Sequence, residues 1–200
     1  MSKEVEDFIK KNAGDVIRSV QGSGLFPSLK MAQMIIESSG KDEKGKFGIG
    51  KGLAVRKANN YFGIKADKSW AGKKVALSTP RDGKPVNFFR VYPMPLDSMK
   101  DHTTFLLKNS RYKTNGVFTA KTPEAQAEAL QRAAYSESPT YSKALIGLIK
   151  AYRLSDLDGK KPTDDFTRWY VLGGTFVLAA TAYAFRNEIK GLFTKQKLAA

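Results

Sequence analysis

The sequence predicts a mainly helical α+β domain with one small β-hairpin, followed by a single C-terminal transmembrane helix. Three observations predict this fold. Several segments carry apolar residues at helical spacing, an Asp-Gly pair separates two short strand-like runs, and a long uncharged segment follows a polar linker. The chain has no cysteine, which excludes disulfides, thiolate metal sites and cysteine nucleophiles. His102 is its only histidine, so a histidine-rich metal centre is excluded as well.

The first two helices are predicted from their apolar residues. These recur at helical spacing over about residues 3–20, which indicates an amphipathic helix. After the break at Gly22–Gly24, Pro27 is suited to the first turn of a second helix, which extends to about Ser39. Apolar residues surround most of this second helix, and a helix that is apolar all round is a buried helix.

The β-hairpin is predicted from two apolar runs, 75–78 and 87–92, which flank Asp82-Gly83. Residues 40–60, before the hairpin, are expected to form a loop rich in Gly and Lys and then a short helical or irregular stretch. The helical pattern returns after the hairpin, and the first of these helices opens with a sequence similar to a capping box. The predicted helices cover residues 98–108, opened by Ser98-Met-Lys-Asp101, residues 123–134 and residues 141–152.

The C-terminal part is predicted to be a membrane anchor. A domain over residues 1–158 is followed by a polar linker, residues 159–168. Residues 169–185 carry no charge, and a helix of that length spans roughly 25 Å, close to the ~30 Å hydrocarbon core of a bilayer. Aromatic residues near both of its ends are typical of an interfacial belt, and a basic tail, residues 186–200, follows. The alternative is a buried C-terminal helix that packs on the domain.

The net charge of +15 indicates an anionic partner. It arises from 34 Lys and Arg against 19 Asp and Glu. Residues 160–200 hold seven basic and three acidic residues, so eleven of the fifteen excess positive charges lie on residues 1–159. Nucleic acid, an acidic membrane surface and a bacterial cell-wall polymer would all fit this charge. Nucleic acid is not the expected partner, because no basic stripe accompanies a nucleic-acid-binding motif.

Glu37 is the candidate catalytic acid. It ends the predicted buried helix, where apolar packing gives way to a polar loop. Burial disfavours a charged carboxylate and raises its pKa, which suits a general acid that works near neutral pH. The alternative is a carboxylate that only caps the helix or pairs with a lysine.

Aromatic side chains interleaved with polar groups provide a candidate sugar-binding surface. Such rings stack on sugars while the polar groups form hydrogen bonds, although similar surfaces also bind nucleic-acid bases. His102 is expected to have a capping or packing role on its helix, with a contact to substrate as the alternative. The candidate substrate-binding residues are Asn60, Tyr61, Phe62, Trp70, Tyr135 and Tyr141.

Six short motifs occur in a fixed order along about residues 5–155. They are Phe8-Ile-Lys-Lys11, Ala32-Gln-Met-Ile-Ile-Glu-Ser38, Ala58-Asn-Asn-Tyr-Phe-Gly-Ile-Lys65, Trp70-Ala-Gly72, Phe89-Arg-Val-Tyr92 and Tyr135-Ser-Glu-Ser-Pro-Thr-Tyr141. Together they resemble the glucosaminidase domains of glycoside hydrolase family 73, the type found in flagellar hydrolases and autolysins.

This resemblance implies a lysozyme-like fold and hydrolysis of the β-1,4 bond between N-acetylglucosamine and N-acetylmuramic acid in peptidoglycan. It implies no metal and no organic cofactor. Glu37 falls on the family's catalytic glutamate, which protonates the leaving glycosidic oxygen. Tyr61, Phe62 and Tyr135 fall on positions that line the family's substrate groove.

The predicted hairpin departs from the family pattern. The family usually carries a second acid shortly before the hairpin turn, and Thr79 stands at that position here. Asp82 is the hairpin's carboxylate and the candidate second catalytic residue, although a turn-forming role also explains it. Assistance by the N-acetyl group of the substrate is the alternative. Ser138 replaces the aspartate of the family's Tyr-Ala-Thr-Asp-Pro pattern, so that turn is expected to be held differently.

The sequence therefore predicts a membrane-anchored peptidoglycan hydrolase of the bacterial envelope, with glycan strands as its partner. The alternatives are a catalytically inactive wall-binding module and a lytic transglycosylase on the same fold. Four basic residues after position 185 favour a cytoplasmic tail and an outward-facing domain. Because residues 1–20 do not have the pattern of a signal peptide, a phage context is expected. The protein would be a lysis enzyme or part of a membrane-containing virion that opens the wall at entry.

Overall fold

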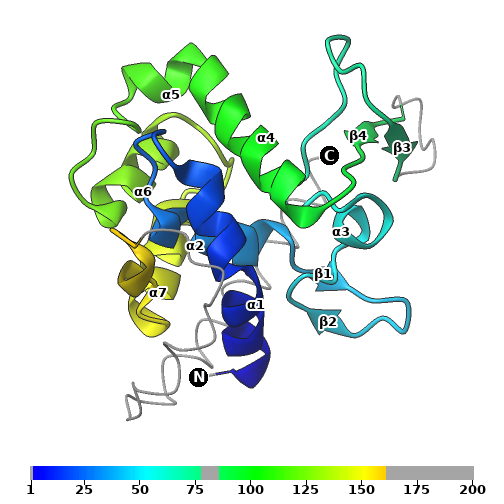
Figure 1. The fold of residues 1–200 in the computed structure, drawn as a ribbon, viewed down its shortest axis with the longest axis horizontal. Helices are drawn as coiled ribbons and strands as arrows, with labels where there is room; N and C mark the ends of the chain where they lie inside the picture. The colour runs from blue at the N-terminus through cyan, green and yellow to red at the C-terminus, as the bar shows by residue number, and fades with distance from the viewer. Residues whose placement is uncertain (1, 78–85, 161–200) are drawn as a thin grey trace.

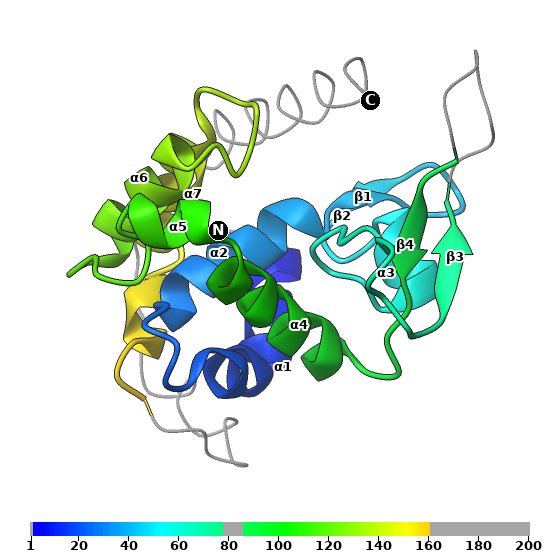
Figure 2. The same ribbon diagram turned by 90° about the horizontal axis from the view of Figure 1, so that it is seen from above.

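The computed structural model describes residues 2–77 and 86–160, which form two regions (Figures 1 and 2). The β region lies on one side of the molecule, and α4 begins beside it and runs across the helical region. The β region comprises β1 (Gly40–Lys41), β2 (Phe47–Gly48), α3 (Leu53–Ala58), β3 (Lys74–Ala76) and β4 (Phe88–Arg90). The helical region comprises α1 (Lys3–Val20), α2 (Pro27–Glu37), α4 (Pro95–Lys108), α5 (Ser110–Thr114), α6 (Pro123–Arg132), α7 (Tyr141–Ala151) and the 3-10 helix η1 (Leu154–Leu157).

The helix α2 is buried, as its apolar sequence predicts. It packs against α1, α6, α7 and η1, and all its residues from Ser28 to Ile36 are buried. Its first turn is held by Asp158, whose carboxylate accepts hydrogen bonds from the Ser28 backbone N–H at 2.8 Å and from the Ser28 hydroxyl at 2.7 Å. A carboxylate is favourable at this end of a helix because it satisfies free N–H groups. The helix ends at Glu37, two residues before the predicted Ser39.

A buried amide on α6 fastens the loops around the start of α2. The Gln126 side chain has no exposed surface. Its oxygen accepts from the Phe26 backbone N–H at 2.8 Å, and its nitrogen donates to the carbonyl oxygens of Gly24 at 2.9 Å and Val117 at 2.6 Å. Three backbone groups, of which that of Val117 lies in the core, thereby gain a hydrogen-bond partner.

The predicted hairpin is present as the antiparallel pair β3–β4. Its register sets Lys74 opposite Arg90 and Ala76 opposite Phe88, so both strands are shorter than the predicted runs. A second small sheet was not predicted, because residues 40–60 read as loop. There β1 and β2 pair antiparallel, and the Asp42 carboxylate closes their turn by accepting the backbone N–H groups of Lys44 and Lys46.

The start of α4 corrects the sequence prediction. The helix begins at Pro95, not at Ser98, and the Asp97 carboxylate accepts the Met94 backbone N–H at 3.2 Å. Ser98 lies inside the helix and is fully buried. Its hydroxyl accepts the Tyr61 backbone N–H at 3.0 Å, so it joins the helical region to the segment between α3 and β3.

The predicted membrane anchor at residues 169–185 and the basic tail lie outside the described residues. Within residues 2–77 and 86–160, no helix combines the length and the apolar character needed to cross a bilayer.

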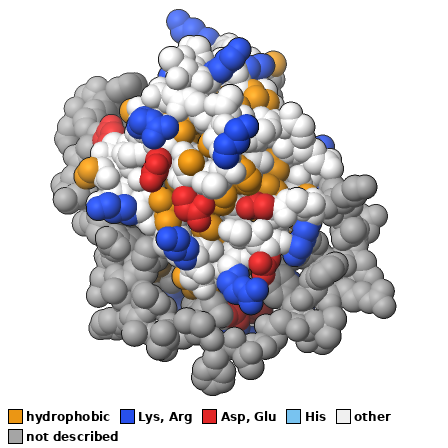
Figure 3. Space-filling model, turned by 90° about the vertical axis from the view of Figure 1, so that its left-hand side faces the viewer, with side chains coloured by type: hydrophobic (Ala, Val, Ile, Leu, Met, Phe, Trp, Pro, Cys, Tyr) orange, Lys and Arg blue, Asp and Glu red, His pale blue; other side chains and the backbone are white. Residues whose placement is uncertain are grey.

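On the side of the molecule that carries α6 and α7, basic and acidic side chains are interspersed. Figure 3 shows Lys and Arg spread over this face, with Asp and Glu among them near a group of hydrophobic side chains. The positive charge of the chain is therefore not gathered into one basic patch on this face.

Candidate active site

Glu37 is positioned by α2 and by a tyrosine from α7. The Tyr141 hydroxyl donates to Glu37 Oε1 at 2.8 Å, and Gln33, one turn earlier on α2, donates its amide to the Tyr141 oxygen at 3.4 Å. Burial raises the pKa of Glu37 to about 7, and the Tyr141 hydrogen bond opposes part of this rise. The residue keeps some solvent exposure. A carboxyl group in this state holds its proton near neutral pH and can deliver it to a substrate.

Tyr135 and Tyr141 form a stacked pair beside this acid. Their ring centroids are 5.4 Å apart, with 21° between the ring planes. Burial first, and then the charge of Glu37, raises the pKa of both hydroxyls well above the ordinary value. Both tyrosines therefore stay protonated and are able to donate hydrogen bonds. The structure brings Glu37, Tyr135 and Tyr141 together, three of the residues that the sequence singled out.

Phe62 and His102 lie behind Tyr135. The His102 ring is stacked on Phe62, with centroids 4.0 Å apart and 6° between the planes, and its Nε2 is 2.9 Å from the Tyr135 hydroxyl. Burial confirms the predicted packing role of His102, whereas capping is wrong because the residue lies in the middle of α4. Its Nδ1 is 2.7 Å from Lys30 Nζ, a residue that sequence reasoning missed. The available signal was a lysine inside an otherwise apolar buried helix.

Asn60 and Tyr61 are buried in the segment that leads from α3 to β3. The Asn60 amide donates to the carbonyl oxygens of Ile64 at 2.9 Å and Arg90 at 3.0 Å, while its oxygen accepts the Ile64 N–H. These bonds use both of its amide hydrogens to hold the chain beside β4. The Tyr61 ring packs at 6.3 Å from the ring of Phe8. Contacts of Asn60, Tyr61 and Phe62 with a substrate stay predictions.

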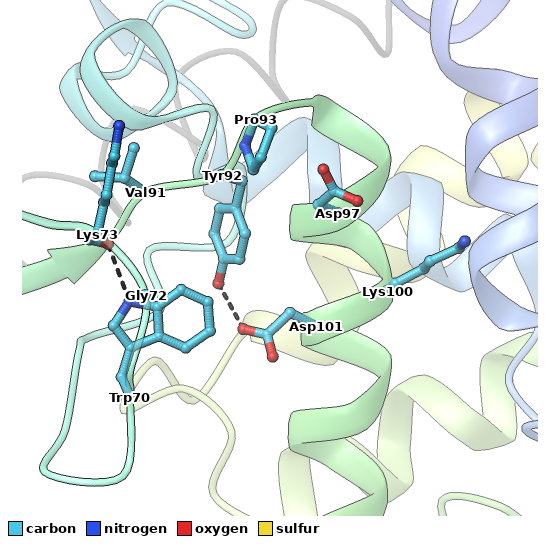
Figure 4. A pocket seen from close by; sticks show the side chains of 9 residues that line it. All are labelled: Trp70, Gly72, Lys73, Val91, Tyr92, Pro93, Asp97, Lys100 and Asp101. Carbon is cyan, nitrogen blue, oxygen red and sulfur yellow. Dashed lines mark hydrogen bonds between the residues drawn. The ribbon is translucent and has the colours of Figure 1, made fainter.

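Trp70 belongs to a second group of side chains, between the β region and the start of α4. It lines a cavity of about 580 Å³ (Figure 4). The Trp70 Nε1–H donates to the Lys73 carbonyl at 2.9 Å, the Arg90 guanidinium lies 4.7 Å above its ring, and the Tyr92 ring packs against it edge-on. Figure 4 also shows the Tyr92 hydroxyl donating to Asp101, at 2.6 Å. These contacts of Trp70 are thus with Lys73, Arg90 and Tyr92 rather than with the stacked tyrosines.

The candidate second acid lies outside the described residues. Asp82 and Thr79 both fall in residues 78–85, between β3 and β4. In the described part of the chain, no three His, Cys, Asp or Glu side chains gather where they could hold a metal ion.

A partly buried acid with a raised pKa at the end of a buried helix is what the general acid of a glycoside hydrolase requires. A comparison with family models makes the assignment specific. The chain belongs to the glucosaminidase family, whose description is mannosyl-glycoprotein endo-beta-N-acetylglucosaminidase and whose model matches residues 13–154.

Relatives in bacteria agree with this family. Peptidoglycan hydrolase FlgJ of Salmonella typhimurium is 31% identical over 159 residues, 75% of this chain and 47% of that protein. A probable N-acetylmuramidase of Lactococcus lactis subsp. cremoris is 32% identical over 165 residues, 77% of this chain and 35% of that protein. The chain thus spans about half or less of these curated relatives.

A solved structure confirms the predicted lysozyme-like, mainly helical α+β fold. The catalytic domain of the autolysin Auto from Listeria monocytogenes matches with a TM-score of 0.63 and 27% identity. The match covers 79% of this chain and 89% of that domain.

Proposed function

We propose that this protein hydrolyses peptidoglycan at the β-1,4 bond between N-acetylglucosamine and N-acetylmuramic acid. The observation that carries the proposal is Glu37, an acid with a pKa of about 7 that a buried tyrosine holds at the end of α2 in a domain of the glucosaminidase family. The names of the relatives, peptidoglycan hydrolase and N-acetylmuramidase, support the same polymer as the substrate.

In the proposed reaction, Glu37 is the general acid. Its proton passes to the glycosidic oxygen as the bond from that oxygen to the anomeric carbon breaks. A water molecule then adds to the anomeric carbon and gives up one proton. Asp82 is the proposed acceptor or nucleophile of this second half, and the acetamido oxygen of the substrate is the alternative. Tyr135, Tyr141, Trp70, Asn60, Tyr61 and Phe62 are proposed to contact the glycan or to shape its binding site.

The test is mass spectrometry of the fragments that the full chain releases from purified peptidoglycan. We expect reducing N-acetylglucosamine ends from the wild type and a loss of at least about 100-fold in Glu37→Gln, because general acids contribute 10²–10⁴-fold to rate. Glu128→Gln, an exposed site on α6, is the matched control and should keep full activity. Asp82→Asn decides whether the hairpin supplies the second carboxylate.

Other products would assign other functions. Reducing N-acetylmuramic acid ends would make the protein a muramidase, and 1,6-anhydro ends would make it a lytic transglycosylase. Binding to peptidoglycan without any released product would make it an inactive wall-binding module. Wild-type activity in Glu37→Gln would remove the acid from the mechanism.

A second readout concerns the pH profile. The general acid has to be protonated, so activity should fall as the pH rises through about 7. The Tyr141 hydrogen bond lowers the pKa of Glu37, so Tyr141→Phe should move this alkaline limb upward, by up to about one pH unit. A downward shift would contradict the assignment of Glu37 to that limb.

We also propose that residues 169–185 anchor the protein in a membrane, in a bacterial envelope or a membrane-containing phage virion. Support comes from the sequence alone, an uncharged segment that basic residues bound on both sides. The full chain should float with phospholipid vesicles in a density gradient in high salt. Val177→Lys places a charge at the middle of the segment and should abolish flotation. Equal flotation of both chains would rule out this anchor.

A further inference from the structure

A lysine and a histidine meet in the core behind Tyr135, and the general-acid step uses neither. The side chains of Lys30 on α2 and His102 on α4 are each 1% exposed. Lys30 Nζ lies 2.7 Å from His102 Nδ1, 2.9 Å from the Thr103 hydroxyl oxygen and 4.7 Å from the centre of the Phe62 ring. Buried charged groups are rare unless they are paired, so this pair requires an explanation.

Thr103 fixes the direction of one of these hydrogen bonds. Its hydroxyl donates to the Met99 carbonyl oxygen at 3.2 Å, so its oxygen accepts from Lys30. The three neighbours of Lys30 Nζ are then the Thr103 oxygen, His102 Nδ1 and the face of the Phe62 ring. An ammonium group has three N–H bonds and no lone pair, and it is attracted to a ring face, so it matches these three neighbours.

If Lys30 donates to Nδ1, His102 has to carry its proton on Nε2. Burial and the charge of Lys30 lower the pKa of His102 well below the ordinary value, so its ring is neutral. Burial lowers the pKa of Lys30 well below its ordinary value, and the charge of Asp101, the residue before His102 on α4, opposes that shift. The Lys30 nitrogen carries N–H bonds to donate in either protonation state. Nε2–H then donates to the Tyr135 hydroxyl oxygen across 2.9 Å.

We propose that Lys30 and His102 are positioning residues that fix the direction of the Tyr135 hydroxyl for hydrolysis. Because the Tyr135 oxygen accepts from His102, its own proton is left to donate to an oxygen of the bound glycan beside Glu37. The reverse tautomer would use the Tyr135 proton on His102 instead. The same bond holds Tyr135 against Tyr141, the partner of Glu37. This inference rests on the proposed function for its catalytic consequence.

The tautomer of His102 can be measured in the protein without substrate. Because His102 is the only histidine of the chain, its ring signals need no further assignment. The full chain labelled with ¹⁵N-histidine gives one pair of ring nitrogens in a long-range ¹H–¹⁵N correlation spectrum. We expect a protonated Nε2 and an unprotonated Nδ1, unchanged between pH values of about 5.5 and 8. A proton on Nδ1, or a doubly protonated ring, would overturn the proposal.

Lys30→Met tests the link from the lysine to catalysis, since methionine fills similar space without a donor. We expect a changed tautomer ratio and a fall in kcat of about 10-fold, the factor that one ordinary hydrogen bond contributes. Lys150→Met, at an exposed position on α7, should change neither. A wild-type spectrum together with wild-type kcat in Lys30→Met would overturn the proposal.

His102→Gln and His102→Leu separate positioning from packing. The glutamine amide can donate to Tyr135 in place of Nε2–H, so His102→Gln should retain more kcat than His102→Leu at matched folded fractions. Equal losses in both would assign His102 to packing alone. If the wild type released no product from peptidoglycan, the proposed function would fail, while the ¹⁵N spectrum would still decide the tautomer.

Discussion

The helical region and the β region are stabilised by different kinds of polar contact. In the helical region the key side chains are buried, as the hydrogen-bonded Gln126 and Lys30 show with exposures of 0% and 1%. The β region is fastened to α4 through Arg90, which pairs with Asp101 at 2.9 Å and with Asp67 at 3.0 Å. These carboxylates are 20% and 60% exposed, so water reaches this fastening.

The difference suits the proposed function, in which the domain holds an acid and also admits a glycan strand. Burial makes each hydrogen bond costly to break, because the separated groups find no water. The helices therefore hold Glu37 and Tyr141 in place. Contacts that water can reach open at lower free energy, so the β region is expected to open locally before the helical region does.

Gln126→Leu should have the largest effect on stability. The substitution keeps an apolar contact in the core but leaves the backbone groups of Gly24, Phe26 and Val117 without their partner. Gly24 is exposed, so water can replace its partner. At about 1–3 kcal/mol for each of the other two groups, we expect the free energy of unfolding to fall by about 4 kcal/mol. Urea unfolding of the full chain measures this, and Glu128→Leu, exposed on the same helix, should change it by less than about 0.5 kcal/mol.

Glu37→Gln should come next, and its effect should depend on pH. Folding raises the pKa of Glu37 from 4.5 to about 7, so between these values the native state binds a proton that the unfolded state has lost. The free energy of unfolding therefore falls as the pH rises through this window, by up to roughly 3 kcal/mol. Glutamine carries no charge at any of these pH values, so the free energy of unfolding of Glu37→Gln should not fall in this way.

Urea unfolding at pH values of about 4.5 and 8 isolates that contribution. Glu37→Gln should match the wild type at the lower pH and exceed it in stability at the higher pH. A constant difference between the two chains would show that the carboxyl group of Glu37 has an ordinary pKa. Glu37 would then be ionised near neutral pH, and the helical region would not hold a protonated acid.

Asp101→Asn should weaken the attachment of the β region by about 1.5 kcal/mol, the lower end of the range for a hydrogen bond to a charged group, because the pair is partly exposed. The variant leaves Asp67 as the carboxylate partner of Arg90 and weakens the Tyr92 contact. Hydrogen exchange should accelerate in β3 and β4 but not in α2. If exchange accelerated equally in β3, β4 and α2, the two regions would open as one unit. The β region would then not open more easily than the helical region.

The sequence predicts best where one signal repeats over many residues. Apolar spacing continues through α1 and α2, and it marks the helix ends closely enough to single out Glu37. The strands β1 and β2 have two residues each, too few for any alternation to show. Sequence reasoning therefore missed the first sheet.

Contacts between distant segments explain the other misses. Both Pro95-Leu-Asp97 and Ser98-Met-Lys-Asp101 fit the start of a helix. The helix begins at the first of them, and the Ser98 hydroxyl bonds instead to Tyr61, from another segment. Lys30 is recognisable as an odd residue in a buried helix, but its partner His102 lies 72 residues away along the chain. Local patterns contain no information on such a pairing.

Asp156→Asn should have the smallest effect. The carboxylate of Asp156 lies 3.5 Å from Arg153, and the two side chains are 60% and 73% exposed. Exposed pairs of this kind contribute about 0–1 kcal/mol, because water and salt screen them, so we expect a change below about 0.5 kcal/mol in urea unfolding. A loss above about 1 kcal/mol would show that exposed pairs stabilise this strongly basic chain. Burial would then no longer explain why Asp101 matters more than Asp156, and the contrast between the two regions would need a different cause.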